Sequence, residues 1–210
     1  MSTDMIIYTL DLLGIAVFAI SGALAAAEKR LDILGFVLFG TITGIGGGTV
    51  RDLLLQTNEV FWIGNTTYLW VCIGASVATW FLAHLFLSLR TLLLWADALG
   101  LSLFSVLGAQ KALAWDAPVL VAIGMGMMTA TFGSLIRDSL LGRPPVLLEP
   151  DIYVTAAAMG AVSYVLMTGQ GASPDIALPL AVVAAFCLRG GAIAFGWRLS
   201  KYNPGGVEPR

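Results

Sequence analysis

The chain has 210 residues, of which 58% are hydrophobic and only 11% are charged, and its mean hydropathy is +0.88. Soluble domains carry about a quarter of charged residues, so this composition excludes an ordinary soluble protein and predicts an integral membrane protein. The formal net charge of −2 offers no basic surface to neutralise phosphates, and no nucleic-acid partner is expected.

Seven apolar stretches are long enough to cross about 30 Å of hydrocarbon as α-helices. In chain order they cover about residues 5–26, 33–55, 66–88, 91–113, 118–141, 151–169 and 176–199. The first lacks a cationic leader and a cleavage signature, so we expect a retained membrane helix rather than a signal peptide. The sequence thus predicts an all-α membrane protein with one transmembrane domain over residues 1–200 and a flexible tail at 201–210.

An internal duplication relates the two halves of the chain. Residues 11–55 and 97–141 align without a gap at an offset of 86, with 15 identities in 45 positions. The repeats cover about residues 5–88 and 91–169, and the seventh helix, about 176–199, stands outside them. Because each repeat holds three spans, the second enters the membrane from the opposite side, which predicts two inverted repeats.

The distribution of Lys and Arg in the short loops predicts the orientation. With the N-terminus outside and the C-terminus in the cytoplasm, the only clear loop cation on the outer side is Lys111. The inner side then collects Lys29, Arg30, Arg90, Arg143, Arg198 and Lys201.

A glycine cluster, Gly46-Gly47-Gly48, lies in the middle of the second span. Three adjacent glycines weaken a helix, and we expect a bend whose free carbonyl groups face a polar path. The alternative is close helix packing, because small residues recur at a spacing of four in both repeats. That stripe consists of Gly40, Gly44 and Gly48, with their duplicates Gly126, Ala130 and Ser134.

Charged residues inside the spans need an aqueous path or a partner of opposite charge. Helical rise places Asp11 near Arg51 at one mouth and Asp97 near Arg137 at the other, so two symmetry-related ion pairs are expected. The alternative is that both arginines extend to the lipid headgroups. The adjacent Asp52 and Asp138 argue against this alternative, because each needs a partner of its own.

Hydroxyl groups gather near the expected bends in both repeats, where they suit a partly dehydrated alkali cation. Each one alone could instead bond to the carbonyl group one turn back. The residues are Thr43, Thr49, Thr129, Thr131 and Ser134.

Catalysis and metal binding are not expected. The single histidine, His84, lies in an apolar segment without Cys, Glu or a second His at ligand spacing. Cys72 and Cys187 read as small buried hydrophobic residues. No nucleophile, base and acid form a set, so an enzyme is excluded, and neither a cofactor nor a metal beyond transient alkali cations is predicted.

The doubled glycine and Arg-Asp motif in this layout resembles the prokaryotic branch of the trimeric intracellular cation (TRIC) channels, over all seven spans. The resemblance implies a homotrimer in a prokaryotic inner membrane, with one path per subunit for monovalent cations, chiefly potassium and also sodium. The kinked second and fifth helices would line it. Where animal members have a Lys-Glu pair that holds an inositol lipid, this chain has Gly44 and Ile45. The lining carried onto this sequence comprises Thr43, Gly44, Gly46, Gly47, Gly48, Thr49, Arg51, Asp52, Thr129, Thr131, Phe132, Gly133, Ser134, Arg137 and Asp138.

Two other functions stay open at this point. Inverted repeats with broken helices are also typical of secondary transporters for small solutes such as amino acids. A non-conducting membrane scaffold or lipid-binding protein would use the glycines for packing alone.

Overall fold

The computed structural model describes residues 3–85, 88–149 and 151–200. Within these ranges the secondary structure is helical, apart from one antiparallel bridge between Asp151 and Arg198. The helices in chain order are α1 (Thr3–Glu28), α2 (Ile33–Leu54), α3 (Phe61–Gly64), α4 (Thr67–Leu82), η1 (Ala83–Leu85), α5 (Leu89–Ala114), α6 (Val119–Leu140), η2 (Val146–Leu148), α7 (Val154–Gly169) and α8 (Pro174–Phe195).

The seven predicted spans correspond to α1, α2, α4, α5, α6, α7 and α8, with ends that differ by a few residues. In the described part of the chain, six helices are long and apolar enough to cross a membrane, and α7 is a shorter apolar helix. The seventh span was predicted to reach residue 199, but α8 ends at Phe195. Gly196 takes a left-handed conformation there (φ 69°) and caps the helix. The predicted flexible tail lies outside the described residues.

The two repeats are related by reciprocal contacts between α1 and α5. Gly14 packs against the ring of Phe104, and the duplicates of these residues, Gly100 and Phe18, make the same contact in the opposite direction. The two phenylalanine rings meet with their centroids 5.1 Å apart. Reciprocity of this kind is what a twofold axis generates. The chain is therefore an all-α membrane protein with two inverted three-helix repeats and a seventh helix.

The duplication extends to the helix ends. Arg30 and Asp116 follow α1 and α5 at equivalent positions, and both have a left-handed backbone, with φ of 55° and 54°. Gln56 and Gly142 do the same after α2 and α6, with φ of 51° and 63°. A left-handed residue after a helix lets the following amide bond back to the last turn. These caps give both repeats the same chain reversals.

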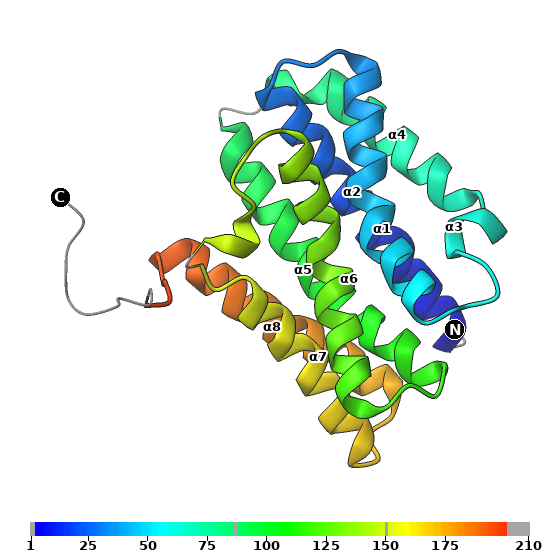
Figure 1. Cartoon of the computed structure of the whole chain (residues 1–210). Coiled ribbons are helices and arrows are strands. Elements are labelled where there is room, and N and C mark those ends of the chain that lie inside the picture. The colour runs from blue at the N-terminus through cyan, green and yellow to red at the C-terminus, as the bar shows by residue number, and fades with distance from the viewer. Residues whose placement is uncertain (1–2, 86–87, 150, 201–210) are drawn as a thin grey trace.

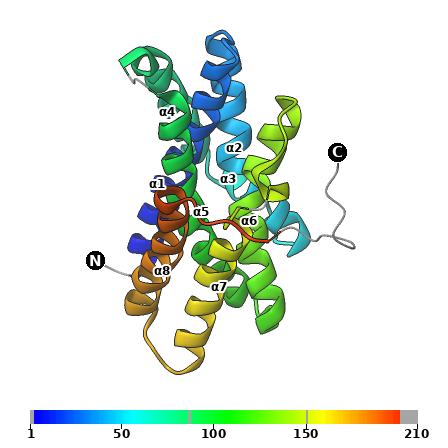
Figure 2. The ribbon, with the colours of Figure 1, turned by 90° about the vertical axis from the view of Figure 1, so that its left-hand side faces the viewer.

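The seventh helix completes the bundle. α8 packs along α5 and α7, and the views from two sides place α7 and α8 side by side (Figure 1, Figure 2). Below, the α3 side means the side where α1 and α4 begin and α2 and α5 end. The η2 side means the side where α1, α6 and α8 end and α5 begins.

Candidate functional site

The second and fifth spans, α2 and α6, cross at a pair of duplicated glycines. A Cβ atom on Gly47 would collide with the backbone carbonyl of Thr129, and one on Gly133 would collide with the carbonyl of Thr43. These contacts exchange under the 86-residue duplication, so the crossing lies on the pseudo-twofold axis. Glycine is required at both positions because any side chain would push the two backbones apart.

α2 is one continuous α-helix over Ile33–Leu54, so Gly46-Gly47-Gly48 does not interrupt it, and the expected bend at these glycines stays a prediction. Most of the glycines serve close contacts, as the packing alternative expects. Gly44 faces the Cys72 sulfur, which would lie 2.9 Å from an added Cβ, and Gly48 faces the Phe61 ring at 2.7 Å. Gly46 has more room, with its nearest neighbour 3.4 Å away. Phe132, the duplicate of Gly46, is half-buried.

The threonine hydroxyls bond within their own helices. Thr43 and Thr49 donate to the carbonyl groups of Phe39 and Ile45, four residues earlier, at 2.6 and 2.8 Å. Thr129 and Thr131 repeat this in α6, at 2.6 and 2.9 Å. A hydroxyl that donates one turn back still has lone pairs free, but its position is fixed by the helix.

On the α3 side, Asp52 is the centre of a buried cluster. Its carboxylate accepts from Arg51 Nε at 2.8 Å and from the backbone N–H of Phe61 at 3.0 Å. Lys111 Nζ lies 3.0 and 3.1 Å from its two oxygens. Lys111 was counted as an outer loop cation, but it lies in the last turn of α5 and reaches back into the bundle.

The two expected ion pairs differ in outcome. Arg137 Nη1 lies 3.0 Å from Asp97 Oδ1, at the expected position. In the described part of the chain, Arg51 forms its ion pair with Asp52 and none with Asp11. The neighbouring carboxylate reaches the guanidinium within the same helix, and Lys111 shares it, so the predicted Asp11–Arg51 ion pair is wrong.

On the η2 side, Arg137 is completely buried. Its Nε and Nη2 donate to the two oxygens of Asp138 at 2.8 and 3.1 Å, in a bidentate pair. Its Nη1 donates to Ser21 at 2.7 Å and to Asp97 at 3.0 Å. One arginine is thus held by two carboxylates, so this cluster has a formal charge of −1.

Tyr153 closes the η2 side from the link before α7. It is fully buried, and its hydroxyl lies 2.6 Å from Ser134 Oγ. Ser134 is the duplicate of Gly48, so an aromatic ring covers the equivalent position on each side of the crossing: Tyr153 here and Phe61 on the α3 side.

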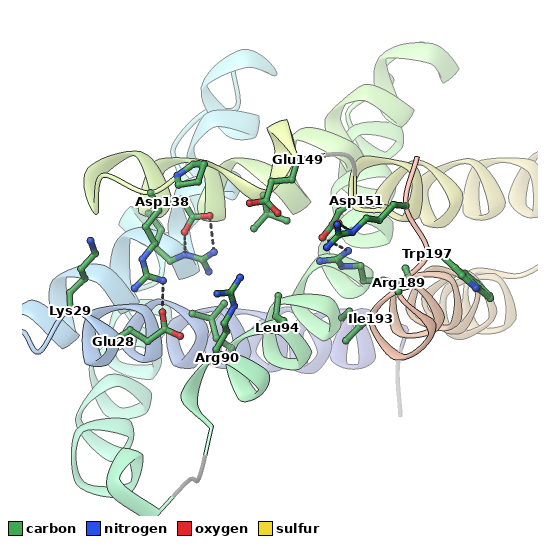
Figure 3. Close-up of a pocket in the computed structure, with 18 residues that line it drawn as sticks. Glu28, Lys29, Arg90, Leu94, Asp138, Glu149, Asp151, Arg189, Ile193 and Trp197 are labelled. Carbon is green, nitrogen blue, oxygen red and sulfur yellow. Dashed lines mark hydrogen bonds and ion pairs between the residues drawn. The ribbon is translucent and has the colours of Figure 1, made fainter. Parts of the chain in front are cut away.

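A cavity of about 640 Å³ lies on the η2 side and reaches Arg137 and Asp138 (Figure 3). Its walls come from the ends of α1, α6 and α8, the start of α5 and the link around η2. Six basic and four acidic side chains line it: Lys29, Arg90, Arg137, Arg143, Arg189 and Arg198 with Glu28, Asp138, Glu149 and Asp151. In the described residues, no three His, Cys, Asp or Glu side chains gather as metal ligands would.

Two ion pairs fix the cavity wall. Arg143 Nη1 lies 2.8 Å from Glu28 Oε2 and ties α1 to the link after α6. Arg189 in α8 is buried, donates to the Ile152 carbonyl at 3.2 Å and lies 3.7 Å from Asp151. Figure 3 shows Arg90 and Glu149 projecting into the space between these two pairs.

The sequence did not identify several residues of this site. Lys111 falls inside the fourth predicted span, but its contact with Asp52 was not expected. Phe61 lies in a stretch that was predicted to be a loop. Tyr153 and Arg189 come from segments beyond the aligned part of the duplication. The one available signal was Tyr68, which begins α4 at a position equivalent to that of Tyr153 within one residue.

Comparison with known proteins places the chain among membrane proteins of similar length. A family model described as glycine transporter matches residues 8–84 and 94–169. The two matches begin 86 residues apart, in agreement with the duplication. A UPF0126 membrane protein from Vibrio cholerae is 37% identical over 199 residues, covering 93% of this chain and 81% of its own. The UPF0126 inner membrane protein YadS of Escherichia coli is 40% identical over 162 residues, which cover 75% of this chain and 77% of YadS.

Solved structures extend the comparison to the whole fold. A TRIC trimeric intracellular cation channel orthologue from Rhodobacter sphaeroides superposes with a TM-score of 0.89 and 45% identity, covering 91% of this chain and 99% of its own. A second structure, described in terms of conductance through TRIC cation channels, gives a TM-score of 0.85 at 30% identity. The match covers 99% of this chain and 100% of the other chain. At these identities the likeness extends to sequence as well as to fold.

Proposed function

The chain belongs to the TRIC-related membrane family that bears the description glycine transporter, and we propose that it is a monovalent-cation channel, chiefly for potassium. In this proposal each subunit has its own path. The path runs between α2 and α6, from the Arg51–Asp52 cluster past the glycine crossing to the Arg137–Asp138 cluster and the cavity.

One observation carries the proposal: a fully buried arginine at the floor of a wide polar cavity. Arg137 is inaccessible at its position in α6, yet it and Asp138 line a space of about 640 Å³. Ionisable groups within membrane spans face a water-filled path or a partner of opposite charge. Arg137 has its carboxylate partners, and the polar cavity beside it would supply the path.

Selectivity for cations is assigned to the buried clusters. On the η2 side Asp97 and Asp138 outnumber Arg137, and on the α3 side Asp11 and Asp52 balance Arg51 and Lys111. Rings of carboxylates favour cations in narrow paths. The cavity itself carries more basic than acidic side chains, so it is a vestibule rather than the filter.

The proposal also covers the oligomeric state and the membrane orientation of the chain. A homotrimer is proposed because the solved relative from Rhodobacter sphaeroides is described as trimeric. The N-terminus is placed outside a prokaryotic inner membrane because the basic loop residues gather on the η2 side, and the Escherichia coli relative is an inner membrane protein. Mass photometry of the detergent-solubilised protein and labelling of cysteines placed in single loops test these two statements.

A second candidate function is uptake of glycine or another small amino acid. The description of the matching family favours it, and inverted repeats are common in transporters. The cavity, which offers both carboxylates and guanidinium groups, suits a zwitterion as well as an inorganic ion.

Liposomes with the purified protein separate the two functions. A channel gives potassium efflux that is little saturated at high concentration and is unaffected by glycine. A transporter gives saturable uptake of labelled glycine that unlabelled glycine competes away. Potassium flux without glycine uptake supports the channel, and glycine uptake without potassium flux overturns it in favour of the transporter.

A further inference from the structure

The short helix α3 is placed directly over the α3-side cluster. It has four residues, Phe61–Gly64, in the connection between α2 and α4. Ile63 and Gly64 are exposed, whereas Phe61 and Trp62 turn inward and are half-buried. A connection of this length can join two helices without a helix of its own. The two aromatic side chains on the inner face of α3 therefore point to a role beyond joining α2 to α4.

Two hydrogen bonds hold α3 to the end of α2. The backbone N–H of Phe61 donates to Asp52 Oδ2 at 3.0 Å. The indole N–H of Trp62 donates to Thr49 Oγ1 at 2.9 Å. Both acceptors belong to the last two turns of α2, so α3 is latched to the part of that helix that carries the Arg-Asp pair.

The Phe61 ring fills the space inside the latch. Its centroid lies 5.8 Å from the Arg51 guanidinium carbon and 5.6 Å from Lys111 Nζ, within reach of cation–π attraction. It meets Tyr68 edge to face at 4.8 Å. Its inner edge rests on Gly48, where an added Cβ would lie 2.7 Å away. The ring thereby covers the α3 side of the α2 helix at the level of the glycine cluster.

The opposite side of the molecule has a different cover. There Tyr153, in the link that leads into α7, is fully buried, and its hydroxyl is hydrogen-bonded to Ser134 of α6. Phe61 has no side-chain hydrogen bond, and α3 has no side-chain cap at its start. The start of α3 is held by the hydrogen bond from the Phe61 amide to Asp52, and Arg51 and Lys111 bind the same carboxylate.

We propose that α3 is a lid that closes the α3 side of the path, with Phe61 as the sealing ring and the Trp62–Thr49 hydrogen bond as its latch. This inference rests on the proposed function for its purpose. A cation that binds Asp52 competes with the Phe61 amide and with Lys111, so its arrival favours release of α3. Release of α3 opens the α3 side of the path down to the glycine crossing, and the cavity gives access from the η2 side.

Thiol labelling tests the lid without any need for current. Gly46→Cys places a thiol on the side of α2 that faces α6, two residues before Gly48 and at the glycine position that has room for a side chain. Cys72 and Cys187 are replaced by Ala in this background. A membrane-impermeant thiol reagent is applied in vesicles oriented so that it meets α3 first. The rate is compared with and without Phe61→Ala, Trp62→Phe and Ile63→Ala. Ile63→Ala is the matched control, because Ile63 lies on the same short helix and is exposed.

The expected result is faster labelling in Phe61→Ala and in Trp62→Phe, and no change in Ile63→Ala. Trp62→Phe removes the Trp62–Thr49 hydrogen bond but keeps an aromatic ring at the position. Loss of this one hydrogen bond predicts an increase in the labelling rate of about two- to tenfold. Equal rates in the parent and in both inner-face variants would overturn the lid. Faster labelling in a protein that passes no ions would retain the lid and refute the proposed channel.

Discussion

Gly47 of α2 lies against the backbone carbonyl of Thr129 in α6, and the duplicated pair, Gly133 and Thr43, makes the reciprocal contact. The pseudo-twofold axis therefore passes through the point where these two helices are closest. Ion-paired clusters lie on both sides of this point, and any path between α2 and α6 must pass it.

Gly47→Ala is expected to destabilise the protein, because its methyl group has no space beside Thr129. Overpacking of this kind costs about 1–3 kcal/mol, although alanine is the better helix former by about 1 kcal/mol. Thermal unfolding in detergent measures the difference. Gly46→Ala is the matched control, since a Cβ there meets nothing closer than 3.4 Å, and it should be neutral or stabilising. Equal losses for both variants would contradict the crossing geometry.

Asp97→Asn is expected to destabilise the protein more than Asp11→Asn. Asp97 binds Arg137 directly, and a lost hydrogen bond to a charged group costs about 1.5–3 kcal/mol. Asp138 still holds Arg137 through two hydrogen bonds, which limits the loss. Chemical unfolding of both variants and of Arg137→Gln checks this. Unchanged stability in Asp97→Asn and in Arg137→Gln would remove the ion pair from the account.

The duplication explains how much of this could be predicted. Spans, inversion and the Asp97–Arg137 pair follow from hydropathy and from an 86-residue offset. The placement of Lys111 does not, because a lysine at a helix end reads as a loop cation until its side chain is seen to reach Asp52. The span of α2 was predicted, but the contact partners of its glycines were not, because three glycines lower helix propensity without showing which neighbour packs on each.

Hydroxyl removal should separate two classes of threonine. In Thr43→Val the lost hydrogen bond lies within α2, so the ratio of potassium to sodium permeability should not change. Thr49→Val removes the acceptor for Trp62 and should raise the open fraction of the channel, and Trp62→Phe should have the same effect. Single-channel recordings of the two variants give both quantities. A changed permeability ratio in Thr43→Val would return that hydroxyl to the ion path.

Lys111→Met should increase cation current relative to chloride current. The substitution removes one positive charge from the α3-side cluster and leaves Asp52 paired with Arg51. Stability should fall by about 1.5–3 kcal/mol, because the Asp52 side chain is fully buried and loses one of its charged partners. Arg30→Gln, which changes an exposed cation outside the path, is the control. A reversal potential that shifts toward chloride in Lys111→Met would contradict this assignment.

The central claim is tested most directly by recording the purified protein in a planar bilayer under opposed potassium and chloride gradients. The account predicts discrete openings that reverse near the potassium equilibrium potential. Reversal near the chloride potential, or silence in a preparation that takes up labelled glycine saturably, would contradict it.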